Sequence, residues 1–322
     1  MANTLRYNNA IPSNIYYANN TVKNVYYNNV KVWSASKPFA FTYTGAYETE
    51  GNLEGNFVIR FKTSGTLTIT SHGNNTSGLY DVFAVGGGAG GGSGAKTTRS
   101  PRGGCGGYTN TKKKISTSLN TSYNIVIGSG GARGTAYGSE TEYYGGDGGL
   151  SSGLGNNANG ATTVKSIWGN QPDSKSYITG YGGSGGGGPA GYNSNGGSGG
   201  SDGSDGEKSP YYTQYLSSYS YYLNGKGQGS TTREFGETSG KLYAGGGGGG
   251  GYNYTNSYAG KGGDGGGGKG QGYSHVDNTG PFAGTANTGG GGGAGYVEPQ
   301  NDGSNAYGAE GGSGIVCIRN AR

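Results

Sequence analysis

Apolar and polar positions alternate one by one along much of the chain between residues 39 and 85. The ranges 39–43, 57–62 and 66–70 alternate in this way, and 79–85 is a mostly apolar run. A period of two, carried by β-branched and aromatic residues, is the signature of a half-buried strand. Shorter runs of the same kind follow at 108–115, 123–127, 161–167, 241–244 and 314–319. Because no segment has a helical period, the sequence predicts an all-β fold.

The chain opens with a repeat of ten residues. Asn-Ile-Tyr-Tyr at 14–17 returns as Asn-Val-Tyr-Tyr at 24–27, and an Asn-Asn pair follows each copy closely. Asparagine tolerates the left-handed backbone of tight hairpin turns, so we predict a small β-meander that ends at Trp33. Short strands of this kind are marginal alone and need a partner. We therefore divide the chain into an attachment segment, 1–36, and a main domain, 37–322.

Long glycine blocks separate the strands of the main domain. Glycine accounts for 78 of the 322 residues and gathers near 86–94, 128–160, 180–206, 245–272 and 289–312. Such blocks are too long for ordinary loops, and glycine loses more backbone entropy on ordering than any other residue. Extended polyproline-II-like segments leave their N–H and C=O groups free to bond neighbouring segments, which can approach closely without Cβ atoms. We therefore expect one polyglycine-II bundle, anchored at its ends by the strands.

Composition and charge narrow the class of protein. The glycine runs break the strict three-residue period of collagen, and 12% aromatic residues with a net charge of +5 do not suit plain disorder. So small a charge gives no reason to expect a nucleic-acid partner. No apolar run reaches the roughly 18 residues of a membrane span, and residues 1–11 lack the pattern of a signal peptide. We expect synthesis in the cytoplasm and no membrane segment.

Candidate catalytic, metal-binding and cofactor-binding residues are not found. The 18 acidic residues are scattered in loops, and the two histidines, His72 and His275, have no cysteine or histidine nearby. Residues 86–91 fit Gly-x-Gly-x-x-Gly, but Pro101 and the surrounding glycines exclude the helix that a dinucleotide site needs. Cys317 lies in an apolar alternation that favours a buried thiol. We therefore expect neither an enzyme nor a cofactor or metal.

Tyrosine gathers in two polar segments between glycine stretches. Residues 209–224 combine it with serine, threonine and asparagine, and 251–258 is a smaller cluster of the same kind. Antibody loops use this composition, because tyrosine gives a large amphipathic contact area at little entropy cost. Two interpretations are open: the rings bind a partner, or they cap the glycine bundle by covering flat backbone. The candidate receptor-binding residues are Tyr211, Tyr212, Tyr215, Tyr219, Tyr221, Tyr222, Tyr252, Tyr254 and Tyr258.

Several stretches together resemble a known class of protein. They are the Tyr-Tyr-Asn repeat up to Trp33, Thr-Ser-Gly-Thr-Leu at 63–67, Tyr-Asp-Val-Phe-Ala-Val-Gly-Gly-Gly at 80–88, Tyr-Asn-Ile-Val-Ile-Gly at 123–128, and Gly-Gly-Ser-Gly-Ile-Val-Cys-Ile-Arg at 311–319. In this order the chain looks like the glycine-rich tail proteins of phages and prophages of Gram-positive bacteria.

Two further resemblances concern architecture. Similarity to the distal adhesin of T-even-like phages implies polyglycine bundles whose connecting loops contact the host receptor. Similarity to the glycine-rich region of the anaplastic lymphoma kinase ectodomain implies a TNF-like or jelly-roll-like β-sandwich with polyglycine helices inserted between strands. The chain departs from the kinase region by lacking its many cysteines, and from the T-even adhesin by carrying the Tyr-Tyr-Asn repeat.

Residues and resemblance together predict a phage tail receptor-binding protein, or adhesin, that recognises a bacterial surface glycan or protein through its tyrosine-rich loops. Residues 1–33 would attach it to other tail proteins, at the tip or fibre of the virion tail. A homo-oligomer such as a trimer is compatible with this role. The alternative is a purely structural fibre or filament protein with a stiff polyglycine bundle. A mere spacer has no need of the segment 209–224, which favours the adhesin.

Overall fold

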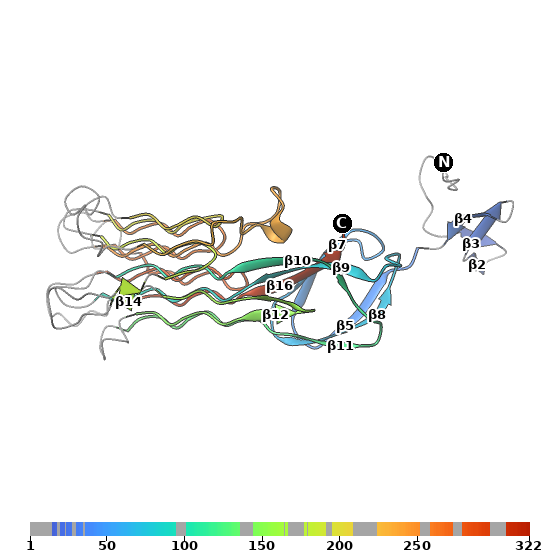
Figure 1. The fold of residues 1–322 in the computed structure, drawn as a ribbon, viewed down its shortest axis with the longest axis horizontal. Coiled ribbons are helices and arrows are strands. Elements are labelled where there is room, and N and C mark those ends of the chain that lie inside the picture. The colour runs from blue at the N-terminus through green and yellow to red at the C-terminus, as the bar shows by residue number, and fades with distance from the viewer. Residues whose placement is uncertain are drawn as a thin grey trace.

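The fold has strands in one half of its length and extended glycine-rich segments in the other (Figure 1). The structure is a computed structural model, and it describes residues 15–17, 20–22, 24–27, 30–34, 36–94, 101–135, 144–163, 165–166, 177–178, 180–190, 195–208, 224–251, 258–272, 279–296 and 307–322. Strands predominate among its regular elements, so the predicted all-β fold is confirmed.

Two antiparallel sheets make up the strand half. Their strands are β5 (Phe39–Tyr43), β6 (Tyr47–Gly51), β7 (Phe57–Phe61), β8 (Gly65–His72), β9 (Leu79–Val85), β10 (Thr109–Ser116), β11 (Ser122–Ile125) and β16 (Ile315–Asn320). The five-stranded sheet has the order β10-β9-β16-β7-β6, and the three-stranded sheet has the order β11-β8-β5. The last strand, β16, is thus inserted at the centre of the larger sheet, where Cys317 pairs with Phe83 on one side and Arg60 on the other.

One hydrophobic core joins the two sheets, and it includes Phe39 and Leu67 of the smaller sheet and Val82 of β9. A second cluster packs Phe83 of the same strand against Phe235, which lies outside both sheets. Strand β9 is therefore buried on both faces. This explains why its sequence is a nearly continuous apolar run without alternation.

Most predicted strands lie within a few residues of the observed ones, and 39–43 and 79–85 coincide with β5 and β9. The strand predicted at 241–244 is wrong, because that stretch makes only an isolated bridge, from Leu242 to Arg233, before it enters a glycine segment. Of the predicted strand 161–167, residues 161–163 form no strand, and 165–166 form β14 (Lys165–Ser166), which pairs with β15 (Tyr177–Ile178). Strand β6 was missed, because its polar Tyr-Glu-Thr-Glu-Gly sequence suits an edge strand.

The N-terminal repeat forms two separate antiparallel pairs in place of the predicted meander. Strand β1 (Ile15–Tyr17) pairs with β2 (Asn20–Val22), and β3 (Asn24–Tyr27) pairs with β4 (Val30–Ser34). Each Tyr-Tyr run pairs with the strand that directly follows it. Each copy of the ten-residue repeat therefore forms its own antiparallel strand pair.

Backbone hydrogen bonds between the glycine segments follow a period of three residues. Along 86–92, every third N–H donates to 102–108, the next set donates to 146–149, and the remaining set donates to 309–312, at N···O distances of 2.8–3.0 Å. A segment can address three neighbours in rotation only if its peptide groups turn by about a third of a circle per residue. The segments are thus extended and regularly twisted, and they do not form a β-ladder.

The carbonyl groups of the same segment point to other neighbours. They accept hydrogen bonds from Ala161 and from the segments 131–134 and 292–295. The segment 245–251 is enclosed in the same manner, since it donates in rotation to 101–104, 197–200 and 265–271. Backbone groups in the middle of this bundle are therefore satisfied by other backbone groups.

This packing leaves no room for most side chains. A Cβ atom added at Gly247 or Gly291 would lie less than 3.0 Å from the carbonyl of a neighbouring segment, which real Cβ atoms essentially never do. The exceptions are small residues such as Ala89, Cys105 and Ala161, which are buried together. Glycine is required here by the approach of one backbone to another.

The depth of a segment in the bundle can be seen in its sequence. In 128–134 every third residue is a buried glycine, while Ser129, Ala132 and Arg133 between them are exposed. The segments 245–251 and 289–293 are uninterrupted glycine and wholly buried. A segment on the surface therefore needs glycine only where it faces inward, whereas an interior segment needs it almost everywhere.

Two local elements interrupt the glycine pattern. The predicted block 128–160 contains a short antiparallel pair, β12 (Ser151–Gly153) with β13 (Asn156–Ala158). A single 3-10 turn, η1 (Glu234–Gly236), lies against the larger sheet. Within the described ranges, no helix has the length and apolar character needed to cross a bilayer.

We expect Gly291→Ala to lower the free energy of unfolding by roughly 1–3 kcal/mol, because the new methyl group would collide with the carbonyl of Gly104 and push two segments apart. The matched control is Gly55→Ala, at an exposed position where an added Cβ meets nothing within 4 Å. Denaturant unfolding of both variants measures the difference. Equal loss of stability in the two would contradict the close packing of the bundle.

Candidate functional site

We call the end of the bundle that lies opposite the two sheets its distal end (Figure 1). Several glycine segments that the structure describes end there. The N–H of Gly206 donates to the carbonyl of Gly225, so this bond joins the residues before and after 209–223. The N–H of Gly260 donates to the carbonyl of Gly249, which joins the residues on either side of 252–257 in the same way. The flanks of both tyrosine-rich segments therefore lie at the distal end, held together by backbone hydrogen bonds.

Of the predicted receptor-binding residues, Tyr258 is described. Its side chain is 46% exposed, while its backbone N–H donates to Asn195 Oδ1 at 2.9 Å and its carbonyl accepts from Gly196 at 3.0 Å. The ring is thus open to solvent on an anchored main chain. The other predicted residues lie outside the described residues: Tyr211, Tyr212, Tyr215, Tyr219, Tyr221, Tyr222, Tyr252 and Tyr254.

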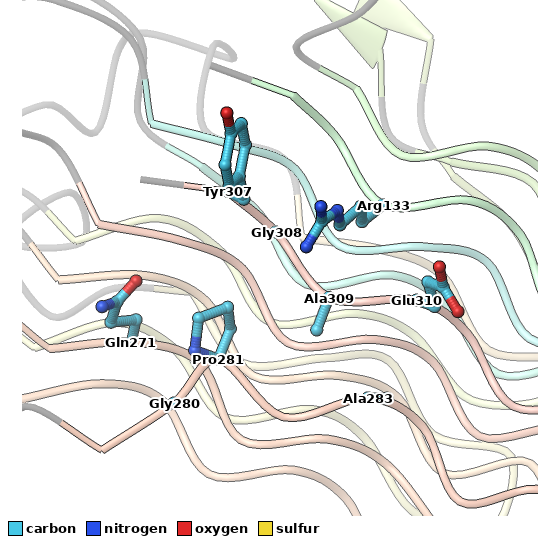
Figure 2. Close-up of a pocket in the computed structure, with 9 residues that line it drawn as sticks. All are labelled: Arg133, Gln271, Gly280, Pro281, Ala283, Tyr307, Gly308, Ala309 and Glu310. Atoms are coloured by element: carbon cyan, nitrogen blue, oxygen red, sulfur yellow. The ribbon is translucent and has the colours of Figure 1, made fainter. Parts of the chain in front are cut away.

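A groove of about 370 Å³ opens on the surface of the bundle (Figure 2). We call it the side groove, and its lining residues are Arg133, Gln271, Gly280, Pro281, Ala283, Tyr307, Gly308, Ala309 and Glu310. Tyr307 directly follows the gap 297–306, so the groove lies close to the distal end. Sequence segments that are far apart meet here because of the bundle packing.

The groove combines flat apolar surface with hydrogen-bonding groups. The Cζ atom of Arg133 lies 4.8 Å from the ring centroid of Tyr307, a cation–π arrangement. Figure 2 shows Gln271 and Pro281 on the opposite side, and Ala309 between the two sides. Within the described part of the chain, Arg133 forms no ion pair.

Sequence reasoning missed these residues because no local motif joins them. One signal was present: Arg133 interrupts a glycine block with a long charged side chain, and such an interruption marks a position that faces out of the bundle. Its contact with Tyr307 could not be read from the sequence, since it depends on which glycine segments become neighbours.

A second hollow, of about 550 Å³, lies beside the larger sheet and is strongly charged. Arg60 donates from Nε and Nη2 to both carboxylate oxygens of Glu234 at 2.7 Å, and from Nη1 to Glu50 at 2.6 Å. The hydrogen bonds that Arg60 donates to Glu234 are the main reason why the pKa of Arg60 is raised. We call the two arginines of this region, Arg60 and Arg319, with their acidic partners the charged clamp.

Arg319 completes the charged clamp. It donates from Nη2 to Glu237 at 2.7 Å and to the buried Asp81 at 3.2 Å, and its Cζ atom lies 4.2 Å from the ring centroid of Phe235. Both arginines thus bind the turn around η1 to the strands. Because both arginines of the clamp are already bonded to carboxylates of the same chain, we assign it a structural role and leave it out of the candidate binding site.

The clamp predicts a loss of stability in acid. The hydrogen bond from Arg319 lowers the pKa of Glu237 below its ordinary value of 4.5, and the hydrogen bond from Lys62 lowers that of Glu48. A carboxyl group with a lowered folded-state pKa stabilises the protein above its unfolded-state pKa, and this contribution disappears as the pH falls through the folded-state value. Stability should therefore decrease as the pH is lowered from about 4.5.

Thermal unfolding at a series of pH values tests this expectation. Glu237→Gln should flatten the acid limb of the profile, because the variant has no carboxyl group to protonate there. Glu54→Gln is the control, since within the described chain the Glu54 carboxylate forms no ion pair. Identical acid limbs in the wild type and Glu237→Gln would contradict the assignment.

Comparison with known proteins bears on the glycine-rich part. The family described as a glycine-rich domain matches residues 62–321, which include β8, β9, β16 and the whole bundle. No curated protein matches the chain. Since the match spans most of the sequence and coincides with the structural bundle, the chain belongs to the glycine-rich domain family.

Proposed function

We propose that this protein is a phage tail receptor-binding protein whose binding surface is at the distal end of the bundle. One observation carries the proposal: the described flanks of both tyrosine-rich segments, 209–223 and 252–257, meet at that end, opposite the sheets (Figure 1). An adhesin needs adaptable polar and aromatic contacts that project away from its point of attachment. Tyr258, exposed on an anchored main chain, has these properties.

The proposed architecture is a polyglycine-II bundle inserted into a TNF-like or jelly-roll-like β-sandwich. The three-residue period of the hydrogen bonds between glycine segments supports the polyglycine-II bundle, because polyproline-II helices have three residues per turn. The core shared by both sheets supports the β-sandwich. In such an arrangement the sandwich is the base and the bundle is a stiff support for the binding surface.

Residues 1–33 are the proposed attachment to a neighbouring tail protein. The strand pairs β1–β2 and β3–β4 are too small to be stable alone, so they gain stability by packing on a partner. The proposed location is the tip or fibre of the virion tail, where the protein would be a monomer or a homo-oligomer such as a trimer. The receptor would be a glycan or protein of the bacterial surface.

A purely structural fibre is the second candidate. The observation in its favour is the saturation of the bundle by backbone hydrogen bonds, which suits a stiff spacer as well as a support. In that case the tyrosine rings would cap the bundle, and removing them would affect stability more than binding. One experiment separates the two candidates.

We expect the double variant Tyr215→Ala, Tyr219→Ala to bind cells of a Gram-positive host at least about 30-fold more weakly, the effect of losing roughly 2 kcal/mol of contact energy. Its melting temperature should stay close to that of the wild type, as expected if the two rings contact a receptor and do not pack against the bundle. The measurement is a binding isotherm of labelled protein on whole cells, with Tyr47→Ala as the control, since exposed Tyr47 is in strand β6 of the larger sheet.

Unchanged cell binding by the double variant would contradict the adhesin. A large fall in melting temperature together with lost binding would assign the two rings to capping, and so favour the structural fibre.

A further inference from the structure

The side groove lies where two surface segments of the bundle separate. Gly284 donates to Glu310 at 2.9 Å, so the segments touch there, and they diverge toward Pro281 and Tyr307. Between them, Gly293 accepts a hydrogen bond from Ala309 at 2.9 Å and donates one to Phe282 at 3.0 Å. Both walls are thus fixed to one interior segment. The main-chain framework of the groove is therefore part of the hydrogen-bonded bundle.

Its size and chemistry suit a small polyhydroxylated ligand. A volume of about 370 Å³ is at the lower end of the range for small-molecule sites. Pro281, Ala283 and Ala309 provide apolar contacts, as the C–H face of a sugar ring requires. The Arg133 guanidinium and the Gln271 amide are planar hydrogen-bonding groups suited to neighbouring hydroxyls.

Other ligand classes fit less well. A polyphosphate or a nucleotide needs several cations, and Arg133 is the one cationic residue among the described lining residues. A divalent metal prefers several carboxylates, and Glu310 is the one acidic residue in that same described set. A peptide that adds a strand needs unpaired backbone, whereas the N–H groups of Gly308 and Ala309 already donate to Gly134 and Gly293.

The rigidity of the walls favours binding. Arg133 is stacked on Tyr307, and Gly308 of the same wall donates to Gly134 at 3.1 Å, so side chain and main chain are both held in place. A site whose groups are already ordered loses less entropy when the ligand binds.

We propose that the side groove is a saccharide-binding site, with the Arg133–Tyr307 stack as one wall and Gln271 and Pro281 as the other. The ligand is one or two sugar units, recognised through an apolar ring face and adjacent hydroxyl or carboxylate groups. None of the described lining residues belongs to the tyrosine-rich segments. This site rests on the proposed function only for the origin of the sugar, namely the host surface.

Saturation-transfer NMR with the full-length protein and purified sugars tests the proposal. The probes are glucose, galactose, N-acetylglucosamine, N-acetylgalactosamine and glucuronate. We expect at least one to receive saturation, with an affinity that falls about tenfold or more in Tyr307→Ala and in Arg133→Ala. Glucuronate compared with glucose shows whether Arg133 recognises a carboxylate. The control is Tyr181→Ala, which removes another exposed tyrosine that does not line the groove.

Two results would overturn the saccharide site: no saturation transfer to any of the five sugars, or equal transfer in the wild type and both groove variants. Thermal unfolding of each variant shows that it is folded, so lost binding cannot be ascribed to misfolding. The cell-binding experiment with Tyr215 and Tyr219 is independent of these probes. Failure of the groove and failure of the adhesin are therefore distinguishable.

Discussion

Hydrogen bonding from one side-chain-free backbone to another is the interaction on which the rest of this structure depends. Glycine loses the most conformational entropy on ordering, and it offers no side chain to bury in return. The bundle compensates through its peptide groups, which bond three neighbours in rotation along 86–92 and along 245–251. The peptide groups can be hydrogen-bonded only where two backbones approach closely, so the two features have the same structural requirement. The absence of a Cβ at Gly247 or Gly291 is what allows each carbonyl to reach its donor.

No single segment of such a bundle can be stable alone, so something must set the register of all of them. The strands do this. Strand β9 continues directly into the glycine segment 86–94, and β16 follows the segment 307–312 and pairs with β9, Ile315 opposite Val85. The charged clamp holds a third point, the turn η1, against the same sheet. Because removal of one partner from a buried ion pair leaves an uncompensated charge, these contacts fix the position of the turn.

Much of the strand half was predictable, because its signals are local. Alternation identified β5, β7 and β8, and the apolar run identified β9, whose two buried faces remove the alternation. Strand β6 was not predictable in this way, since its glutamates serve Arg60 at a sheet edge and not an apolar core.

The glycine half was predictable in kind but not in detail. The need for extended, mutually bonded segments follows from composition, whereas the choice of neighbours does not, because runs of glycine carry no information that distinguishes one partner from another. The side groove depends on that choice: Arg133 and Tyr307 are far apart in sequence and meet only through the arrangement of the segments. The binding role of the tyrosines in 209–223 remains a prediction from composition. The described residues on either side of this segment belong to the bundle.

Hydrogen exchange of the glycine amides tests the central claim most directly. The N–H groups of 245–251, Gly289 and 291–293 are bonded to neighbouring segments and buried, so their exchange should require opening of the bundle. Exchange followed by mass spectrometry on peptides from these two segments should therefore be as slow as exchange in the core strand β9. Rapid exchange, at the rate of an unstructured glycine-rich peptide, would contradict the hydrogen-bonded bundle.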